Sequence, residues 1–482
     1  MKHLPTFSQF RHHLFQGLAD PQSSQKSPGA GWHGTSIVAW LMVPMMMMVI
    51  NISMFGVALP TIRATFHIQA DVTAWLVTAY MLPFVIFMPL YGRLADGLGK
   101  QRLFLIGLGV FLVGTLIVLF AADLRLLILG RAIQGIGSSG INPLCIAMIS
   151  DFIPIEQRGK ALATWNSIGP MSAMAAPILG GFMIDHLGWR TIFWPVLLVG
   201  LIAVVAVRHR IPTIKPHHNQ PGFLQAFDWG GVVLLSIATT MFVFYLSSRP
   251  ITGVAALRDW RLLTITLLFF GAFIVWERRQ AVPFVTLEMF ANKTFSRTSI
   301  CAGIRMFTMS GIGFLIPLYL TDIHGLGAAS TGFMLMLHAV SLLVSMRFGG
   351  HLADRLNNRW PITTGLLVQA LLMLYIGWLP GTVLLPWVMV GLVGHGLGAG
   401  LSLAAMHRSS LSKIPQAQSG AAAGLYSMIR FTGTVLGTAL GGVLLQQGLD
   451  QAVLPAEAYQ VVFWCIAGVA LLGVVIGWGV PE

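Results

Sequence analysis

Charged residues are scarce in this chain. Lys, Arg, Asp and Glu together account for 9% of its 482 residues, whereas hydrophobic residues account for 56%. A water-soluble protein of this length carries roughly a quarter of its residues as charged side chains. The shortage therefore excludes a soluble multidomain protein, and most side chains have to face lipid or other apolar helices.

Acidic residues are the scarcer of the two charged types, with 16 Asp and Glu against 29 Lys and Arg. None lies near the middle of a long apolar run; the nearest, Asp151, Asp185, Asp322 and Asp354, stand at the ends of such runs. The chain also lacks the H-E-x-x-H, G-x-x-x-x-G-K-[ST] and G-x-S-x-G patterns. We therefore expect no enzyme, no cofactor and no ATP-driven transport by this chain alone.

Cysteine is rare as well. Cys145, Cys301 and Cys465 lie far apart inside apolar runs, a spacing that suits neither a disulfide framework nor a zinc site. The formal charge of +13 does not point to nucleic acid, because the basic residues are spread over short loops instead of one patch. We expect reduced thiols, no metal and no nucleic-acid partner.

Long apolar runs are what the chain has in abundance. A helix needs about 20 mostly apolar residues to cross a bilayer. The sequence predicts fourteen such spans in an all-α polytopic membrane protein, at 37–59, 72–91, 103–122, 125–149, 160–184, 192–208, 229–247, 262–276, 299–320, 329–350, 361–380, 382–406, 418–444 and 459–479.

The basic residues orient these spans. With the N-terminus inside, 20 Lys and Arg fall in cytoplasmic loops and six in outer loops, while three lie within helices. This bias predicts that both termini are cytoplasmic. The first 35 residues are polar and contain no apolar stretch, so we expect a disordered cytoplasmic tail and not a cleaved signal peptide.

The chain repeats itself. Asn51, Gly56 and Pro60 of the first span align with Thr308, Gly313 and Pro317 of the ninth, and similar pairs link later spans. Two parallel six-helix repeats around a central path are the arrangement of major facilitator transporters. We expect a tail (1–35), a six-helix half (36–208), a linker with two inserted helices (209–298) and a second half (299–482).

A short basic segment recurs in both halves. Gly92–Arg102 lies between the second and third spans and is expected to form a turn, and a second copy follows 258 residues later. A carboxylate there can accept bonds from neighbouring cations or cap a helix, and so hold helix ends together in one conformation. The competing interpretation is a solvated loop. The expected latch residues are Gly92, Arg93, Asp96, Gly99, Lys100, Arg102, Asp354 and Arg355.

The polar residues inside the spans are basic or neutral. Arg131 shares a helix face with Gln134, and an arginine in an apolar helix is interior-facing and functional as a rule. Its counterpart in the repeat is Leu392, so the fold does not require the charge. A positive interior without carboxylates favours anionic or weakly acidic amphiphiles. Satisfied core side chains are the competing interpretation for the histidines. The candidate coupling and substrate residues are Arg131, Gln134, Asn51, Arg305, His338 and His395.

The ordered set of motifs resembles a known family. Gly92–Arg102, the Arg131–Gly137 segment, Gly188–Phe193 and Pro283–Phe290 together are similar to the fourteen-helix drug:proton antiporter branch of the major facilitators, the EmrB/QacA-like exporters. In that family the arginine is tied to proton coupling. An antiporter-like motif in the fifth span combines small surfaces with missing backbone donors that permit bending: Gly169, Pro170, Pro177, Gly180 and Gly181. One departure stands out, because Asn51 occupies the position where this branch carries an aspartate.

The resemblance implies a secondary active exporter of amphiphilic drugs or toxic compounds, including weak acids and anions. It would work by alternating access and proton antiport in the cytoplasmic (inner) membrane. It also allows a periplasmic adaptor protein as partner. Two alternatives stay open: a dedicated exporter or flippase of a metabolite, lipid or glycan precursor, and a non-transporting membrane scaffold or sensor.

The latch hypothesis predicts the behaviour of Asp96→Asn. The amide keeps the shape of the side chain and loses its charge, so turnover should be lost while the amount of protein in the membrane stays near normal. Efflux from cells, normalised to membrane abundance, measures this effect. Unchanged efflux would count against the latch.

Overall fold

The fold was analysed in a computed structural model that describes residues 34–213, 227–280, 283–414, 419–451 and 454–481. This part of the chain is helical and contains no strand. Fourteen of its helical segments are long and apolar enough to cross a membrane, as the sequence predicts. The expected N-terminal tail lies outside the described residues, apart from the start of the first helix.

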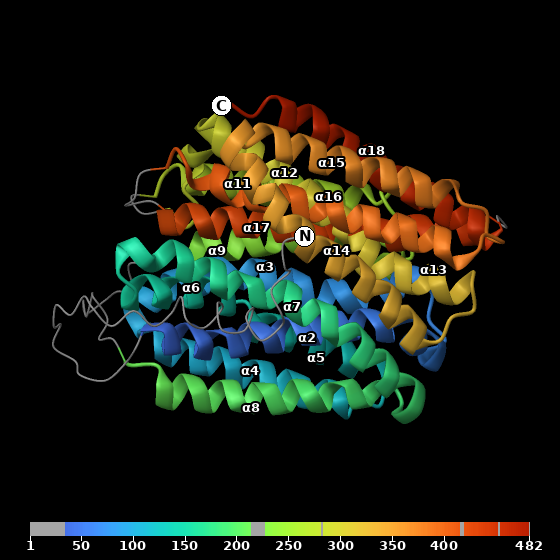
Figure 1. Cartoon of the computed structure of the whole chain (residues 1–482), viewed down its shortest axis with the longest axis horizontal. Coiled ribbons are helices and arrows are strands. Elements are labelled where there is room, and N and C mark those ends of the chain that lie inside the picture. Colours follow the sequence, from blue (N-terminus) through green and yellow to red (C-terminus); the bar gives the residue numbers. More distant parts are fainter. Residues whose placement is uncertain (1–33, 214–226, 281–282, 415–418, 452–453, 482) are drawn as a thin grey trace, which may run out of the picture.

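The long helices run side by side along the long axis of the molecule (Figure 1). They are α2 (Gly34–Phe66), α3 (Ala70–Leu98), α4 (Lys100–Leu119), α5 (Leu124–Ser138), α6 (Ile141–Phe152), α7 (Ile155–Leu187), α8 (Phe193–Arg210), α9 (Trp229–Leu246), α11 (Trp260–Glu277), α12 (Lys293–Ser310), α13 (Ile316–Asp322), α14 (Ala328–Leu356), α15 (Arg359–Trp378), α16 (Leu385–Leu411), α17 (Ser419–Asp450) and α18 (Pro455–Trp478). Short helical turns are η1 (Trp189–Ile192), α10 (Arg249–Thr252), η2 (Leu287–Ala291) and the π-helical η3 (Gly311–Leu315).

Two predicted spans are interrupted at prolines. The fourth span divides into α5 and α6, three residues before Pro143, which has no N–H to donate to the carbonyl of Ser139. The ninth divides into α12, η3 and α13, and Pro317 likewise leaves the carbonyl of Gly313 without its helical donor. The π-helical turn absorbs this loss within a continuous rod.

The expected turn at Gly92–Arg102 is mostly helix, which corrects the sequence interpretation. Helix α3 continues to Leu98 and α4 begins at Lys100, so the chain reverses at Gly99 alone, with φ at 87°. Glycine tolerates this left-handed region because it has no Cβ. In the second copy Asn357 takes the equivalent position with φ at 71°.

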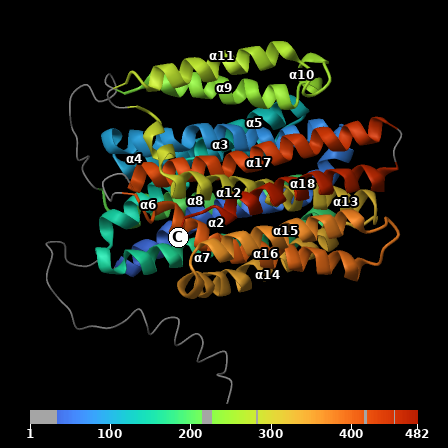
Figure 2. The same ribbon diagram turned by 90° about the horizontal axis from the view of Figure 1, so that it is seen from above.

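The helices form two groups and an insert. The N-terminal group (α2–α8) and the C-terminal group (α12–α18) meet most extensively where α7 packs on α14 and α3 packs on α17. The insert (α9–α11) is a hairpin that lies along α3 and α17, so it covers one side of the seam between the groups (Figure 2).

One face of the outer helices is apolar and exposed, as lipid contact requires. On α8 the exposed residues are Trp194, Leu198, Leu201 and Val205. Their spacing of three and four residues places them on one stripe of the helix. The buried residues of α8, such as Phe193, Val196 and Ala203, face the N-terminal group.

The two ends of the bundle differ. We call the end that carries Gly99, Asn357 and the majority of the Lys and Arg residues the basic end, and the other the opposite end. At the opposite end a single apolar core joins both groups, with Phe55 and Phe193 in the same cluster as Phe314 and Leu318. Towards the basic end the apolar core divides into one cluster made mainly by the N-terminal group and one made mainly by the insert and the C-terminal group.

Polar contacts follow the same division. At the opposite end Arg63 of α2 pairs with Asp322 of α13 at 2.6 Å, and Asp322 also accepts a bond from Tyr459 at 2.7 Å. Asp185 of α7 accepts the backbone N–H groups of Ala328 and Ala329 at the start of α14, at 3.0 and 2.8 Å. The bonds of Arg63 and Asp185 cross the seam, so the described structure is closed at the opposite end.

The ion pair between Arg63 and Asp322 leads to a prediction for Arg63→Ala. The ion pair is partly exposed, so its loss should destabilise the closed state by up to ~1 kcal/mol. The equilibrium constant for opening at the opposite end should therefore rise by up to roughly fivefold. Spin labels at Thr65→Cys and Gln451→Cys, with the exposed Cys465 replaced by serine, report the distance across this end. The population with the longer distance should increase. Arg125→Ala, an exposed arginine at the same end, is the control and should leave the distribution unchanged.

Candidate functional site

Arg131 lies fully inside the N-terminal group, with 1% of its surface exposed. Its Nε donates to the carbonyl of Leu76 at 3.2 Å, and its Nη1 donates to Oε1 of Gln134 at 2.8 Å. The guanidinium also stands over the rings of Phe55 and Tyr80, 3.9 and 4.4 Å from their centroids. Its charge is therefore stabilised by neutral dipoles and aromatic faces.

Gln134 links three helices. Its Nε2 donates to Oγ1 of Thr115 on α4 at 2.9 Å and to Oδ1 of Asn51 on α2 at 3.4 Å. The structure thus brings together Arg131, Gln134 and Asn51, three of the six candidate coupling and substrate residues. The Nδ2 atom of Asn51 is buried and has no hydrogen-bond partner, so this network keeps one unused donor.

Arg305 is the corresponding buried cation of the C-terminal group. Its Nε donates to the carbonyl of Ala399 on α16 at 2.9 Å, and its exposed fraction is 3%. One turn further along α12, Thr308 donates to Oε1 of Gln369 on α15 at 2.7 Å. Arg305 therefore fixes α12 against α16 without any carboxylate.

His338 and His395 form a pair between α14 and α16. Nε2 of His338 lies 3.1 Å from Nδ1 of His395, so one ring donates a hydrogen bond to the other. Both side chains are buried, and Nε2 of His395 has no partner.

A third basic group was not chosen as a site by the sequence analysis. Nη1 of Arg430 on α17 lies 3.3 Å from Nε2 of His407 on α16, and its guanidinium stands 4.4 Å from the centroid of Phe431. Its Nε has no acceptor, and the hydroxyl of Tyr426, one turn earlier, has no partner either. Arg430 and His407 are only half-buried. A lone arginine inside an apolar run was the available signal, whereas nothing in the sequence linked His407 to it.

The interior of the described part of the chain is consequently positive. Its four ion pairs involve Arg63, Lys100, Arg249 and Arg408, all near helix ends. Arg131, Arg305 and Arg430 make none. A cation buried without a counter-ion carries a large desolvation cost, which neutral dipoles offset only in part. Arg430 is the least satisfied of the three, because Arg131 and Arg305 each donate from Nε to a backbone carbonyl.

The expected latch residues lie at the basic end but not in one cluster. Lys100 pairs with Asp151 at 2.5 Å, and Nη2 of Arg93 donates to the carbonyl of Pro283 at 3.0 Å. Asp354 pairs with Arg408, which also donates to Asn358. Arg102 and Arg355 are exposed, and Gly92 is half-buried beside Pro143. The side chain of Asp96 lies outside the described residues.

The antiporter-like motif of α7 lies on the seam. A Cβ at Gly181 would come within 2.3 Å of the carbonyl oxygen of Ala328 on α14, and one at Gly180 within 2.9 Å of Met54 on α2. The carbonyl of Pro177 would in turn lie 2.1 Å from a Cβ at Gly332. Gly169 and Pro170, nearer the basic end, are less tightly packed, with Met45 as the nearest neighbour of Gly169 at 3.4 Å.

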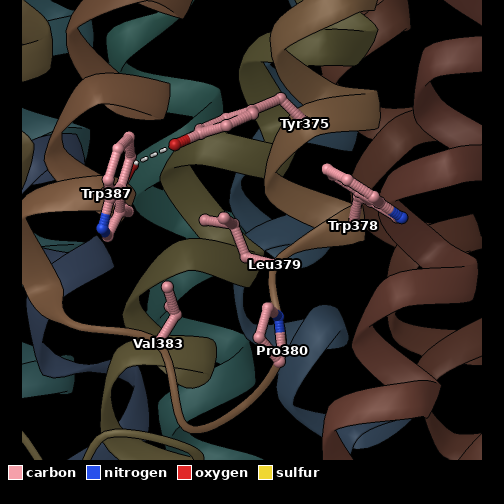
Figure 3. A pocket seen from close by; sticks show the side chains of 6 residues that line it. All are labelled: Tyr375, Trp378, Leu379, Pro380, Val383 and Trp387. Carbon is pink, nitrogen blue, oxygen red and sulfur yellow. Dashed lines mark hydrogen bonds between the residues drawn. The ribbon is translucent and has the colours of Figure 1, made fainter.

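A surface pocket of about 330 Å³ lies elsewhere, where α15 connects to α16 (Figure 3). It is lined by Tyr375, Trp378, Leu379, Pro380, Val383 and Trp387. No charged side chain lines it, and the hydroxyl of Tyr375 is used in a bond to the carbonyl of Trp387 at 3.3 Å. The pocket shares no residue with the basic groups. No cluster of three or more His, Cys, Asp or Glu that could hold a metal occurs among the described residues.

The sequence matches the Major Facilitator Superfamily over residues 41–295 and 298–481. The chain belongs to this superfamily. Its members are transporters rather than enzymes, and the helical groups and interior polar residues described above are therefore those of a transporter.

Several similar proteins are known. Multidrug resistance protein 3 of Bacillus subtilis is 27% identical over 387 residues, which cover 78% of this chain and 72% of that protein. Riboflavin transporter RibZ of Clostridioides difficile is 26% identical over 435 residues, covering 88% and 92%. The tetracenomycin C resistance and export protein of Streptomyces glaucescens is 25% identical over 428 residues, covering 88% and 79%.

Solved structures show the same fold at low identity. The POT family transporter PepTSo aligns with a TM-score of 0.68 and 15% identity, over 93% of this chain and 97% of its own. The human organic anion transporter MFSD10 aligns with a TM-score of 0.64 and 15% identity, over 94% and 100%.

Arg131→Leu tests the N-terminal network, since the repeat carries the fully buried Leu392 at the equivalent position. Packing should survive, and the loss of the donor to Gln134 should cost about 1–3 kcal/mol of stability. Transport should fall by at least about tenfold, which corresponds to an interaction of more than ~1.4 kcal/mol. Thermal unfolding in detergent and flux in liposomes measure the two effects. Wild-type flux would restrict Arg131 to a structural role.

Proposed function

We propose that this transporter is a secondary active exporter of amphiphilic small molecules and that it prefers weak acids and other organic anions. The observation that carries the proposal is the set of interior arginines without carboxylates, Arg131, Arg305 and Arg430. An anionic substrate would supply the missing counter-charge, whereas a lipophilic cation would be repelled.

The substrate would bind between the two groups of helices. Arg430 and His407 are half-buried and keep unused hydrogen-bonding capacity, so they are the side chains best placed to take an anionic group. The methionines of α2, among them Met45 and Met46, are also half-buried and offer adaptable apolar contact for the rest of an amphiphile.

Alternating access would move the N-terminal group against the C-terminal group. The described structure is closed at the opposite end by Arg63–Asp322 and by Asp185 at the start of α14. Export would require these bonds to break while the basic end closes. Asp96 and Asp354, with Arg93, Lys100 and Arg355, would then serve as the latch of the basic end. The antiporter-like motif of α7 would provide the bend.

We further propose that the chain belongs to the EmrB/QacA-like drug:proton antiporter branch, with both termini on the cytoplasmic side of the inner membrane. Fourteen spans and relatives named for multidrug resistance and antibiotic export support this assignment. The adaptor protein that this branch uses remains part of the proposal. With Asn51 buried in place of an aspartate, proton antiport would need a titratable group outside the centre of the spans.

Export of one dedicated metabolite is the second candidate. The missing central carboxylate sets this chain apart from exporters of cationic drugs, and one relative is named a riboflavin transporter. A comparison of dye efflux with metabolite accumulation in a deletion strain separates the two functions.

The anion preference is tested with purified protein in liposomes. We expect uptake of a carboxylate-bearing dye and no uptake of a quaternary ammonium dye. Arg430→Ala should raise the KM for the anion by about tenfold, since a charged hydrogen bond contributes more than ~1.4 kcal/mol. Arg347→Ala, an exposed arginine on α14, is the control and should leave the KM unchanged. Movement of the ammonium dye without the anion would contradict the proposal.

A further inference from the structure

Two carboxylates meet in the insert, outside the basic groups described above. Asp228 precedes α9 and Glu277 is the last residue of α11, and the two helices pack on each other as a hairpin. A Cβ at Gly231 would stand 2.5 Å from Oδ2 of Asp228 and 2.6 Å from Oε1 of Glu277. The two oxygens can therefore be no more than about 5 Å apart.

No described cation forms an ion pair with these two carboxyls. Glu277 is buried, with 3% of its surface exposed, and Asp228 is half-buried. Besides Asp228, the charged group that acts on Glu277 is Arg93 of α3, whose guanidinium is bonded to the carbonyl of Pro283 instead. Two like charges this close in an apolar setting bind a proton strongly.

The two carboxyls differ in the hydrogen bonds that they accept. Asp228 accepts the backbone N–H of Gly231 at 2.8 Å, the indole N–H of Trp276 at 2.7 Å and the N–H of Phe284 at 3.3 Å. Among the described residues, Glu277 accepts the N–H of Val285, at 3.4 Å to each of its oxygens. Glu277 therefore has fewer and longer hydrogen bonds than Asp228 to stabilise a negative charge, which makes it the better candidate for the neutral acid.

The pair holds the segment 283–286, which leads from the insert to the C-terminal group. Phe284 and Val285 donate to the two carboxyls, and the preceding residue, Pro283, accepts the bond from Arg93. The segment thus connects the carboxyl pair to the basic end of α3, one turn and a half from the reversal at Gly99. Loss of the proton would make Asp228 and Glu277 repel and would release this segment.

We propose that Glu277, beside the carboxyl of Asp228, is a proton-binding site that sets the pH dependence of transport through the Pro283–Arg93 contact. The transport readout rests on the proposed function, whereas proton binding does not. The site would supply a titratable group in a chain whose described spans carry no carboxylate near their centres.

Infrared spectroscopy tests the proton directly. A neutral carboxyl group absorbs at a different infrared frequency from an ionised carboxylate. Glu277 is one of five glutamates in the chain. Of the other four, the two whose side chains the structure describes, Glu288 and Glu457, are exposed. Wild-type protein labelled with ¹³C-glutamate should show a carboxyl band that shifts with the label and disappears as pH is raised. Glu277→Gln should lack the band, and Glu288→Gln, an exposed residue of η2, should retain it. Absence of a label-sensitive band in the wild type overturns the site, whether or not the variants fold.

Flux in liposomes tests whether the proton site sets the pH dependence of transport. The amide in Glu277→Gln imitates the protonated acid, so flux of the anionic dye should vary with pH by less than about twofold where wild-type flux varies severalfold. Arg93→Ala should keep the infrared band and lose the pH dependence. A wild-type pH profile in either variant overturns the role in transport. If the wild-type protein moves no organic anion, the proposed function fails while the infrared result still decides the proton site.

Discussion

The burial of positive charge without negative charge is the constraint on which the centre of this protein depends. A guanidinium in a low-dielectric interior has to be surrounded by oriented dipoles. Arg131 obtains them from the Leu76 carbonyl, Gln134 and two aromatic rings, which requires α2, α3 and α5 to meet at one place. Arg305 does the same for α12 and α16. Arg430 lacks part of this shell, because its Nε has no acceptor.

Close helix contact at the seam is the second requirement. Gly181 and Gly332 let α7 and α14 approach until a backbone oxygen occupies the place of a Cβ. At the opposite end of the bundle, Asp185, Asp322 and Arg63 bond across this seam. The insert lies along the other contact, between α3 and α17, and is attached to α3 through Arg93 at the basic end. The insert therefore contacts both groups.

The local sequence predicted the spans well, because a bilayer requires helices of fixed length whose exposed faces are apolar. It predicted the reversal near Gly99 less well. A charged residue such as Arg93 and a glycine such as Gly97 resemble a loop in composition, yet α3 remains helical to Leu98. The chain breaks only where Gly99 adopts a positive φ.

The sequence by itself determined the membrane class, the fourteen spans, the superfamily and the presence of arginines in apolar helices, since each depends on local composition or spacing. Only the tertiary structure decided the partners of those arginines. Gln134 is three residues from Arg131 and was predictable, but His407 reaches Arg430 from another helix. Asp228 and Glu277 are separated by a whole hairpin, and helix packing alone brings their oxygens together. Contacts of this kind depend on how helices cross, and no pattern within one helix records that.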